Sequence, residues 1–227
     1  MVGDARTHLP GLMTPSESSP APSPFELDAS LMAHRHNFTQ HQRRRLILAT
    51  ARRLIAESGG ATLPLQRLAQ ECDTSRQNIH NMIGGKRDII WASLIEFNEQ
   101  VLSCIPKTND IGNLYPSFLR TYKMVAEIYP EYISAAERIM FSDHELYRKL
   151  IKKSAQHFLP VVKSLLGASD FRKEHWQVSY QLLSVPHNAV RDWIEGACTI
   201  DEMFDDWIFG TDVVISGALS KFGGVSN

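Results

Sequence analysis

The polar side chains between residues 75 and 82 are of the types that recognise DNA bases. The segment reads SRQNIHNM, and the polar residues after its serine are Arg76, Gln77, Asn78, His80 and Asn81. A guanidinium pairs with two acceptors of guanine, and the amides of Asn and Gln match the donor and acceptor of adenine. The composition predicts base recognition, and the candidates are Arg76, Gln77, Asn78 and Asn81. A short solvated helix without a ligand would have the same composition.

The elements around this segment favour base recognition over a solvated helix without a ligand. Ser75 is a good N-cap, and Ile79, Met82 and Ile83 form the apolar stripe of a short helix. Upstream, apolar residues recur at spacings of three and four over 65–72, and residues 73–74 break that pattern. Two short helices joined by a tight turn, with the second polar on its exposed face, form a helix-turn-helix, whose second helix lies in the major groove of DNA.

A longer helix is expected before this pair. The ordered chain is predicted to begin near residue 40, and apolar residues recur at helical spacing from Ile47 to Ile55. Gly59 and Gly60 follow and predict its end. Pro64 then stands where the first turn of the next helix tolerates proline.

The basic residues of the chain are concentrated around these helices. Residues 34–90 hold ten Lys and Arg against four Asp and Glu, whereas the segments before and after are net negative, and the whole chain has a formal charge of -1. Such a distribution is typical of a module that binds a polyanion on an otherwise acidic body. A solvated helix face is the alternative explanation of the charge imbalance alone.

Residues 47–90 resemble, without a gap, the DNA-binding domain of the tetracycline-repressor (TetR) family of bacterial transcription regulators. The matching segments are ILATARRLIAESG, LQRLAQECDTS and SRQNIHNMIGGKRDII. The resemblance implies a homodimer that places one recognition helix of each subunit in the major groove of a palindromic operator. It also implies release from DNA by a small organic ligand bound in the C-terminal region.

Within this resemblance, the candidate phosphate contacts are Arg43, Arg44, Thr62, Ser75, His80 and Lys86. The family usually has Tyr where His80 stands, and a ring N–H could replace its phosphate contact; a structural role for His80 is the alternative. Pro64 stands where the family often has Ser or Thr and has no donor, so Thr62 is the substitute. Asp73 stands where the family frequently has Gly in the turn, and Asp can fill this position because it tolerates a left-handed backbone. The N–H groups that open the helix at Lys86 are suited to phosphate.

The remainder of the chain is predicted to be helical, giving an all-α fold of about nine helices. The Tyr129–Pro130 step divides two helices, and Pro186 is expected to kink or break another. Thr199 and Glu202 predict a capping box at the start of the last helix. The domains are then a disordered, proline-rich tail (1–38), the helix-turn-helix domain (39–90) and a helical ligand-binding and dimerisation domain (91–227).

The last helix carries apolar residues on two sides, more than one core-facing side requires. A central core helix in a monomer is one explanation, and the resemblance implies instead that the last two helices of each subunit form a four-helix interface between identical subunits. Gly210 and Gly217 would permit close approach of another helix. The residues predicted at the dimer interface are Met203, Phe204, Trp207, Val214, Ile215, Gly217 and Ala218.

Aromatic residues of the C-terminal region are candidates for a ligand pocket between helices, with ordinary core packing as the alternative. The candidates are Phe118, Tyr122, Tyr147, Trp176 and Tyr180. No catalytic residue, cofactor or metal site is predicted, because His144, His157, His175 and His187 have no partner at a recognised spacing. His34, His36 and His41 are interpreted as part of a basic arm, since no Cys or carboxylate lies at ligand spacing.

The sequence contains no run of about 18 apolar residues and no signal-peptide pattern, so we expect no contact with a membrane and a cytoplasmic location. The resemblance implies a bacterial protein that is associated with the nucleoid when it is bound to DNA. Three widely spaced cysteines predict free thiols. The most favoured hypothesis is therefore a homodimeric, ligand-released repressor. The alternatives are a DNA-binding regulator or architectural factor controlled by a protein partner, and an enzyme with a basic helical arm.

Overall fold

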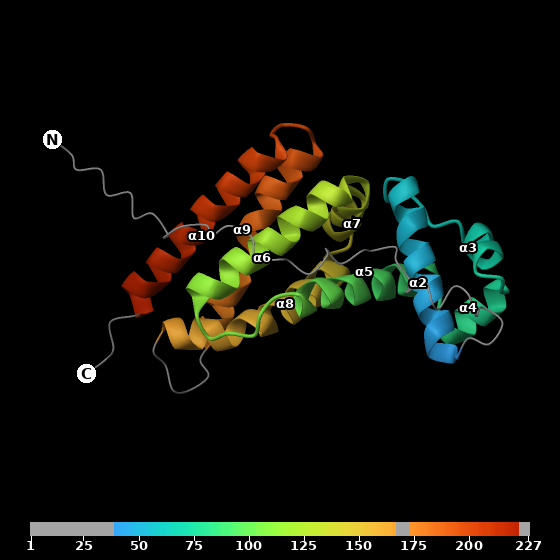
Figure 1. Cartoon of the computed structure of the whole chain (residues 1–227), viewed down its shortest axis with the longest axis horizontal. Coiled ribbons are helices and arrows are strands. Elements are labelled where there is room, and N and C mark those ends of the chain that lie inside the picture. The colour runs from blue at the N-terminus through green and yellow to red at the C-terminus, as the bar shows by residue number, and fades with distance from the viewer. Residues whose placement is uncertain (1–38, 167–172, 223–227) are drawn as a thin grey trace.

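The computed structural model describes residues 39–166 and 173–222, and within these ranges the chain is helical without strands. This confirms the predicted all-α fold and helix number. The predicted disordered tail, with His34 and His36, lies outside the described residues. The helices, labelled as in Figure 1, are α2 (Gln40–Glu57), α3 (Leu65–Glu71), α4 (Arg76–Met82), α5 (Lys86–Ser103), α6 (Ile111–Ile128), α7 (Pro130–Ser142), α8 (His144–Leu165), α9 (Lys173–Ile194) and α10 (Ile200–Phe222).

Helices α2, α3 and α4 form a small unit at one end of the molecule (Figure 1). Its core joins Ile47 of α2, Leu68 of α3 and Ile79 of α4, all of which are buried. The start of α2 is fixed by a capping box in which the Thr39 hydroxyl accepts from the backbone N–H of Gln42, and the Gln42 side chain accepts from that of Thr39. Apolar burial and capping thus define this unit locally.

Helix α5 connects the small unit to the rest of the molecule. Its first half contributes Ile89 to the core of the unit, and its second half contributes Phe97 to the core of the body. The buried Arg52 of α2 donates to the carbonyl oxygen of Ser93 at 3.1 Å and to Glu96 at 3.2 Å, which fixes α2 on α5. The predicted domain boundary at residue 90 therefore falls inside a continuous helix.

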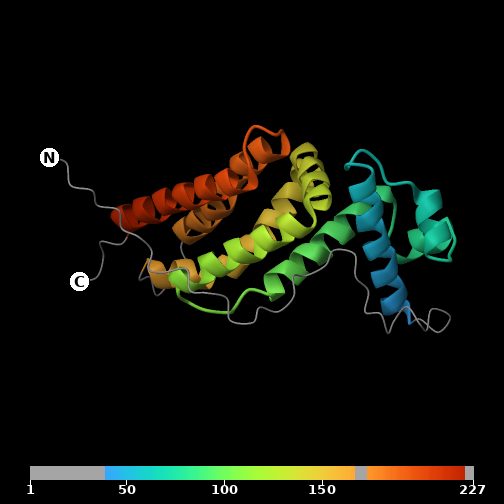
Figure 2. The ribbon, with the colours of Figure 1, turned by 45° about the horizontal axis from the view of Figure 1, so that its top comes forward.

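Helices α6 to α10 form an elongated body, seen from two directions in Figures 1 and 2. Helix α9 packs against both α8 and α10. An aromatic cluster holds the centre, where the ring of Phe118 meets those of Phe158 and Trp207 edge to face at centroid distances of 5.2 and 5.7 Å. Such edge-to-face contacts stabilise a core beyond the area they bury.

Helix α7 belongs to both parts of the molecule. Ala135 packs into the core of the small unit, whereas Tyr132, Ile133 and Ala136 pack into the core of the body. The approach is close, because a Cβ atom added at Gly60 would lie 2.7 Å from the carbonyl oxygen of Ala135. A displacement of α7 would therefore also displace the end of α2.

Several local predictions are confirmed, and one alternative is excluded. Gly59 and Gly60 end α2 with φ of 61° and 84°, and one helix ends at Ile128 before another begins at Pro130. The backbone N–H of Thr199 donates to Glu202 at 2.8 Å, as the capping box requires. Of the kink or break expected at Pro186, the break is not found, because α9 continues through the proline. Packing of α9 on α8 and α10 offsets the lost backbone hydrogen bond.

Candidate DNA-binding surface and ligand cavity

Helix α4 presents its polar residues to solvent, as predicted. The hydroxyl of Ser75 accepts from the backbone N–H of Asn78 at 3.1 Å, which confirms the cap. Ile79 is 2% exposed and anchors the helix in the core of the small unit. The exposed residues of this surface are Ser75, Arg76, Gln77, Asn78, His80 and Asn81.

Two of the predicted base contacts already interact with each other. The amide of Gln77 donates to the amide oxygen of Asn81 at 2.8 Å, one helical turn away. Asn78 lies beside Thr74, at 3.5 Å between its amide nitrogen and the hydroxyl oxygen. The turn that positions them contains Asp73 with φ of 49°, the left-handed conformation predicted there. The four candidate base contacts therefore lie exposed on a single helix of two turns.

Some cations of the small unit form ion pairs and others do not. Among the described residues, Arg53 and Arg67 pair with Glu57 and Glu71, which are acidic residues of the same unit. Ion pairs to the body use Arg52 and Arg87. Within the described ranges, no ion pair is formed by the remaining cations, which are Arg43, Arg44, Arg45, Arg76 and Lys86. The excess positive charge is thus contributed by α2's first turns, by α4 and by the start of α5.

The structure brings two predicted phosphate contacts together. The ammonium group of Lys86 donates to the hydroxyl of Thr62 at 3.2 Å, although 24 positions separate them in the chain. Pro64 precedes α3 without any side-chain cap, in agreement with its missing donor. At the start of α5 the backbone N–H of the cap residue Gly85 donates to Asp88 at 2.8 Å. This bond does not involve the N–H groups from Lys86 onward, which are the ones predicted to bind phosphate.

The interface predicted on α10 needs a correction. Met203, Phe204 and Trp207 are buried inside their own chain, where Trp207 stacks on Phe204 at 5.5 Å between centroids. Ala218 is also buried, in a cluster with residues of α8 and α9. Gly210 lies against Val185 of α9, so it serves packing within the chain. The sequence showed two apolar sides on this helix but did not show which side faces the core.

The outer side of α10 is the unpartnered one. Phe209 is 71% exposed and Val213 is 56% exposed, and Gly217 has open space around it. Val214 and Ile215, also predicted at the interface, are partly buried and pack against the internal cluster that contains Ala218. Four of the five exposed large apolar residues in the described ranges lie on α10, namely Ile208, Phe209, Val213 and Leu219. We call these four residues the outer apolar face.

A cavity of about 120 Å³ lies inside the body. Residues of five helices, α5 to α9, line it together with Trp207 of α10, and most of them are aliphatic or aromatic. Of the predicted pocket residues, Phe118 and Tyr122 line it. Tyr147 packs against the lining residue His187 at 4.7 Å between ring centroids. Trp176 and Tyr180 pack against each other, outside the lining, so their assignment to this pocket is not supported.

The cavity contains a carboxylate that the sequence reasoning missed. Glu137 of α7 is 5% exposed, and one of its oxygens accepts from the hydroxyl of Tyr122 at 2.9 Å. Its Oε2 lies 3.6 Å from Nδ1 of His187 on α9. Burial and the neighbouring carboxylate raise the pKa of Tyr122 well above its usual value, so this hydroxyl remains a donor. A clue was present, because Glu137 continues the helical spacing of the apolar residues Ile133, Ala136 and Met140.

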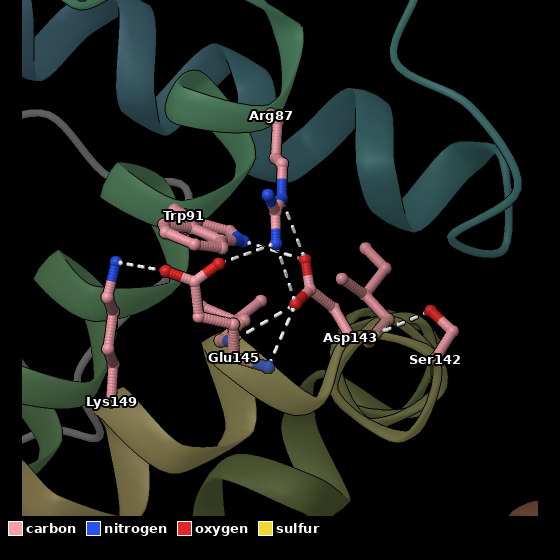
Figure 3. A network of polar contacts seen from close by, with 8 residues as sticks. Arg87, Trp91, Ser142, Asp143, Glu145 and Lys149 are labelled. Carbon is pink, nitrogen blue, oxygen red and sulfur yellow. Dashed lines mark hydrogen bonds and ion pairs between the residues drawn. The ribbon is translucent and has the colours of Figure 1, made fainter.

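A second polar network joins the start of α5 to the corner between α7 and α8 (Figure 3). The guanidinium of Arg87 donates twice to Asp143 and once to Glu145, each at 3.1 Å. Asp143 also accepts from the indole of Trp91 at 3.0 Å and from backbone N–H groups that begin α8. The Arg87 guanidinium therefore holds the pKa of Asp143 well below its usual range. Lys86, the predicted phosphate contact, is the residue next to Arg87.

No protein-family model, curated protein or solved structure matches this chain. The assignment of the site therefore depends on its own geometry. Within the described ranges, no group of His, Cys, Asp and Glu is arranged to hold a metal ion. The three cysteines are free thiols. In the same ranges no helix combines the length and the apolar character that crossing a membrane requires.

Proposed function

We propose that this chain is a homodimeric DNA-binding transcription regulator of the tetracycline-repressor type, released from a palindromic operator by a small organic ligand. The observation that carries the proposal is the set of exposed Arg, Gln and Asn side chains on α4, beside cations that form no ion pair within the described part of the chain. Base edges require such donors and acceptors, and phosphates require such cations. The resemblance of residues 47–90 to that family supports the same assignment.

Each part of α4's surroundings has a role in this proposal. Arg76, Gln77, Asn78 and Asn81 read bases in the major groove. The phosphate contacts are Arg43, Arg44, Thr62, Ser75, His80 and Lys86, and the Lys86–Thr62 hydrogen bond presents two of these donors at one point. The phosphate contacts position the protein on the duplex, whereas the base contacts select the sequence.

The outer apolar face of α10 is the proposed contact between subunits. One helix-turn-helix makes few contacts with DNA, so two copies on a two-fold axis are needed to recognise two half-sites. Phe209 and Val213 supply exposed apolar area, and the open surface at Gly217 permits close approach. A rigid pairing of the last helices would fix the spacing of the two α4 helices.

Helix α7 is the proposed route from the cavity to the DNA-binding end. It lines the cavity with Glu137, Ala136 and Met140, and it contacts the small unit through Ala135. A ligand that binds one position of α7 more tightly than another changes the orientation of α2 to α4. A coupling free energy of roughly 1 to 3 kcal/mol changes operator affinity about 5- to 150-fold.

The test is a selection from random DNA fragments with the purified chain, followed by sequencing. The proposal expects enrichment of one palindromic site whose half-sites lie about one helical turn or a multiple apart. A variant with Arg76, Gln77 and Asn78 all replaced by Ala is the control, because these side chains are exposed and their loss leaves the anchor Ile79 in place. Equal enrichment by the chain and by this variant would refute the proposal.

A further inference from the structure

We infer that the cavity of the body binds a small organic ammonium ion, whose positive group pairs with Glu137 and whose apolar part contacts the aromatic wall. The inference concerns the class of ligand, and its role as the effector rests on the proposed function. Three independent features support it: an enclosed carboxylate with an unused oxygen, the absence of a permanent cation in the lining, and a set of aromatic faces around the remaining space.

The carboxylate of Glu137 is nine-tenths buried and only partly satisfied. Tyr122 donates to Oε1, but Oε2 has no hydrogen-bond partner among the described residues. Nδ1 of His187 also lacks one, and the 3.6 Å between these two atoms is too long for a good hydrogen bond. A buried carboxylate is costly unless it is paired and hydrogen-bonded. An N–H donor placed between these groups would supply the missing partner.

The lining provides no permanent positive charge for this carboxylate. Its side chains, as far as the structure describes them, include no Lys and no Arg, and the basic group that lies beside Glu137 is the imidazole of His187. That imidazole is held from its other side by the rings of Tyr147 and Phe141. A cation that completes the site must therefore come from the ligand, which excludes carboxylate and phosphate ligands by repulsion from Glu137.

The rest of the cavity suits the apolar part of such a cation. The rings of Phe118, Tyr122 and Trp207 surround one side, and the electron-rich faces of aromatic rings attract organic cations. The volume of about 120 Å³ is comparable with the apolar cavity of about 150 Å³ that holds one benzene ring in another protein. The ligand class is therefore a primary or secondary amine with one ring or a short branched chain.

Isothermal titration of the purified chain with benzylamine and with benzyl alcohol tests this inference. Both carry the same ring and arm, but only the amine is charged at neutral pH. We expect benzylamine to bind at least about tenfold more tightly, since only it pairs with the buried carboxylate. Equal affinity for both probes, or no binding of benzylamine, would overturn the inference. This result needs only the unaltered protein.

Two variants locate the effect. Glu137→Gln keeps the shape of the side chain and removes its charge, so the preference for benzylamine over benzyl alcohol should disappear. Glu131→Gln changes an exposed carboxylate on the same helix and should leave the preference unchanged. A preference that persists in Glu137→Gln would refute the pairing. The titration contains no DNA, so its failure would leave the DNA-binding proposal standing, and failure of DNA binding would leave the titration valid.

Discussion

The two ends of the molecule use polar side chains in opposite ways. On α4, Gln77 and Asn78 stand in solvent with only short-range contacts, ready to exchange water for another polar surface. In the body, Glu137 is enclosed by apolar side chains and contacts residues far away in the chain. Exposed polar groups cost little to present and suit a large, polar partner, whereas an enclosed carboxylate suits a small partner that fits the cavity. The difference agrees with the proposal that one end recognises DNA and the other end a small ligand.

The largest effect is expected at the outer apolar face, which must join two copies if the DNA-binding end is to read two half-sites. Phe209→Glu would place a charge without a partner at the interface and should raise the dimer dissociation constant by about 100-fold or more, roughly 3 kcal/mol. Because Phe209 is exposed in the single chain, the free energy of unfolding of the monomer should change by less than about 0.5 kcal/mol. Analytical ultracentrifugation and thermal unfolding measure the two quantities.

Gln181→Glu is the matched control for that substitution, since it adds a charge at an exposed position on the neighbouring helix α9 that lies outside the outer apolar face. A wild-type chain that is monomeric at micromolar concentration, or a Phe209→Glu variant that remains a dimer, would remove α10 from the proposed interface. In that case α10 would not set the spacing between the α4 helices of two subunits.

A medium effect is expected at the phosphate contacts. Lys86→Ala should weaken binding to all DNA sequences alike and reduce the slope of log affinity against log salt by about 0.9, because one phosphate contact is lost. Fluorescence anisotropy over a salt series measures this slope. Lys152→Ala removes the same charge from an exposed position on α8 and should leave the slope unaltered. Equal slopes for both variants would exclude Lys86 from the phosphate contacts.

The smallest effect is expected at Asp143, between the two ends. Its pKa is depressed because Arg87 donates to it, so its contribution to stability is present above the unfolded pKa near 4 and is lost as pH falls toward the folded pKa. Asp143→Asn keeps a side chain able to cap α8, and should lower Tm by a few degrees at pH 7. This difference should shrink as pH falls from 5 to 2. A difference that is constant over this range would contradict the ionic role.

The sequence was sufficient where structure depends on near neighbours. The cap at Ser75, the left-handed Asp73, the stop at Gly59 and the polar side of α4 are confirmed, since each is decided by a few consecutive residues. The pairing of Glu137 with Tyr122 and His187 was not predictable, because three helices bring those residues together. For the same reason the sequence placed Trp207 at a subunit interface. The spacing showed that α10 has two apolar sides, but only tertiary packing decides which one is buried.

The continuous α9 shows the same limit. A proline inside a helix costs about 3 kcal/mol when local structure alone is considered, which is why a kink or break is expected at Pro186. The neighbouring helices on both sides of α9 outweigh this cost. Arg52 is a second example, because its place in a basic segment gives no sign that it is buried. The structure buries it as a link between α2 and α5.

The central claim is that α4 reads the DNA sequence, and the most direct measurement is the affinity of Gln77→Ala and Asn78→Ala for the selected palindrome and for a scrambled duplex of equal length. Base contacts specify and phosphate contacts do not, so each variant should lose roughly 1 to 3 kcal/mol on the palindrome and almost nothing on the scrambled duplex. Gln156→Ala, at an exposed position on α8, should match the wild type on both. Equal losses on the two duplexes, or no loss on either, would contradict the account.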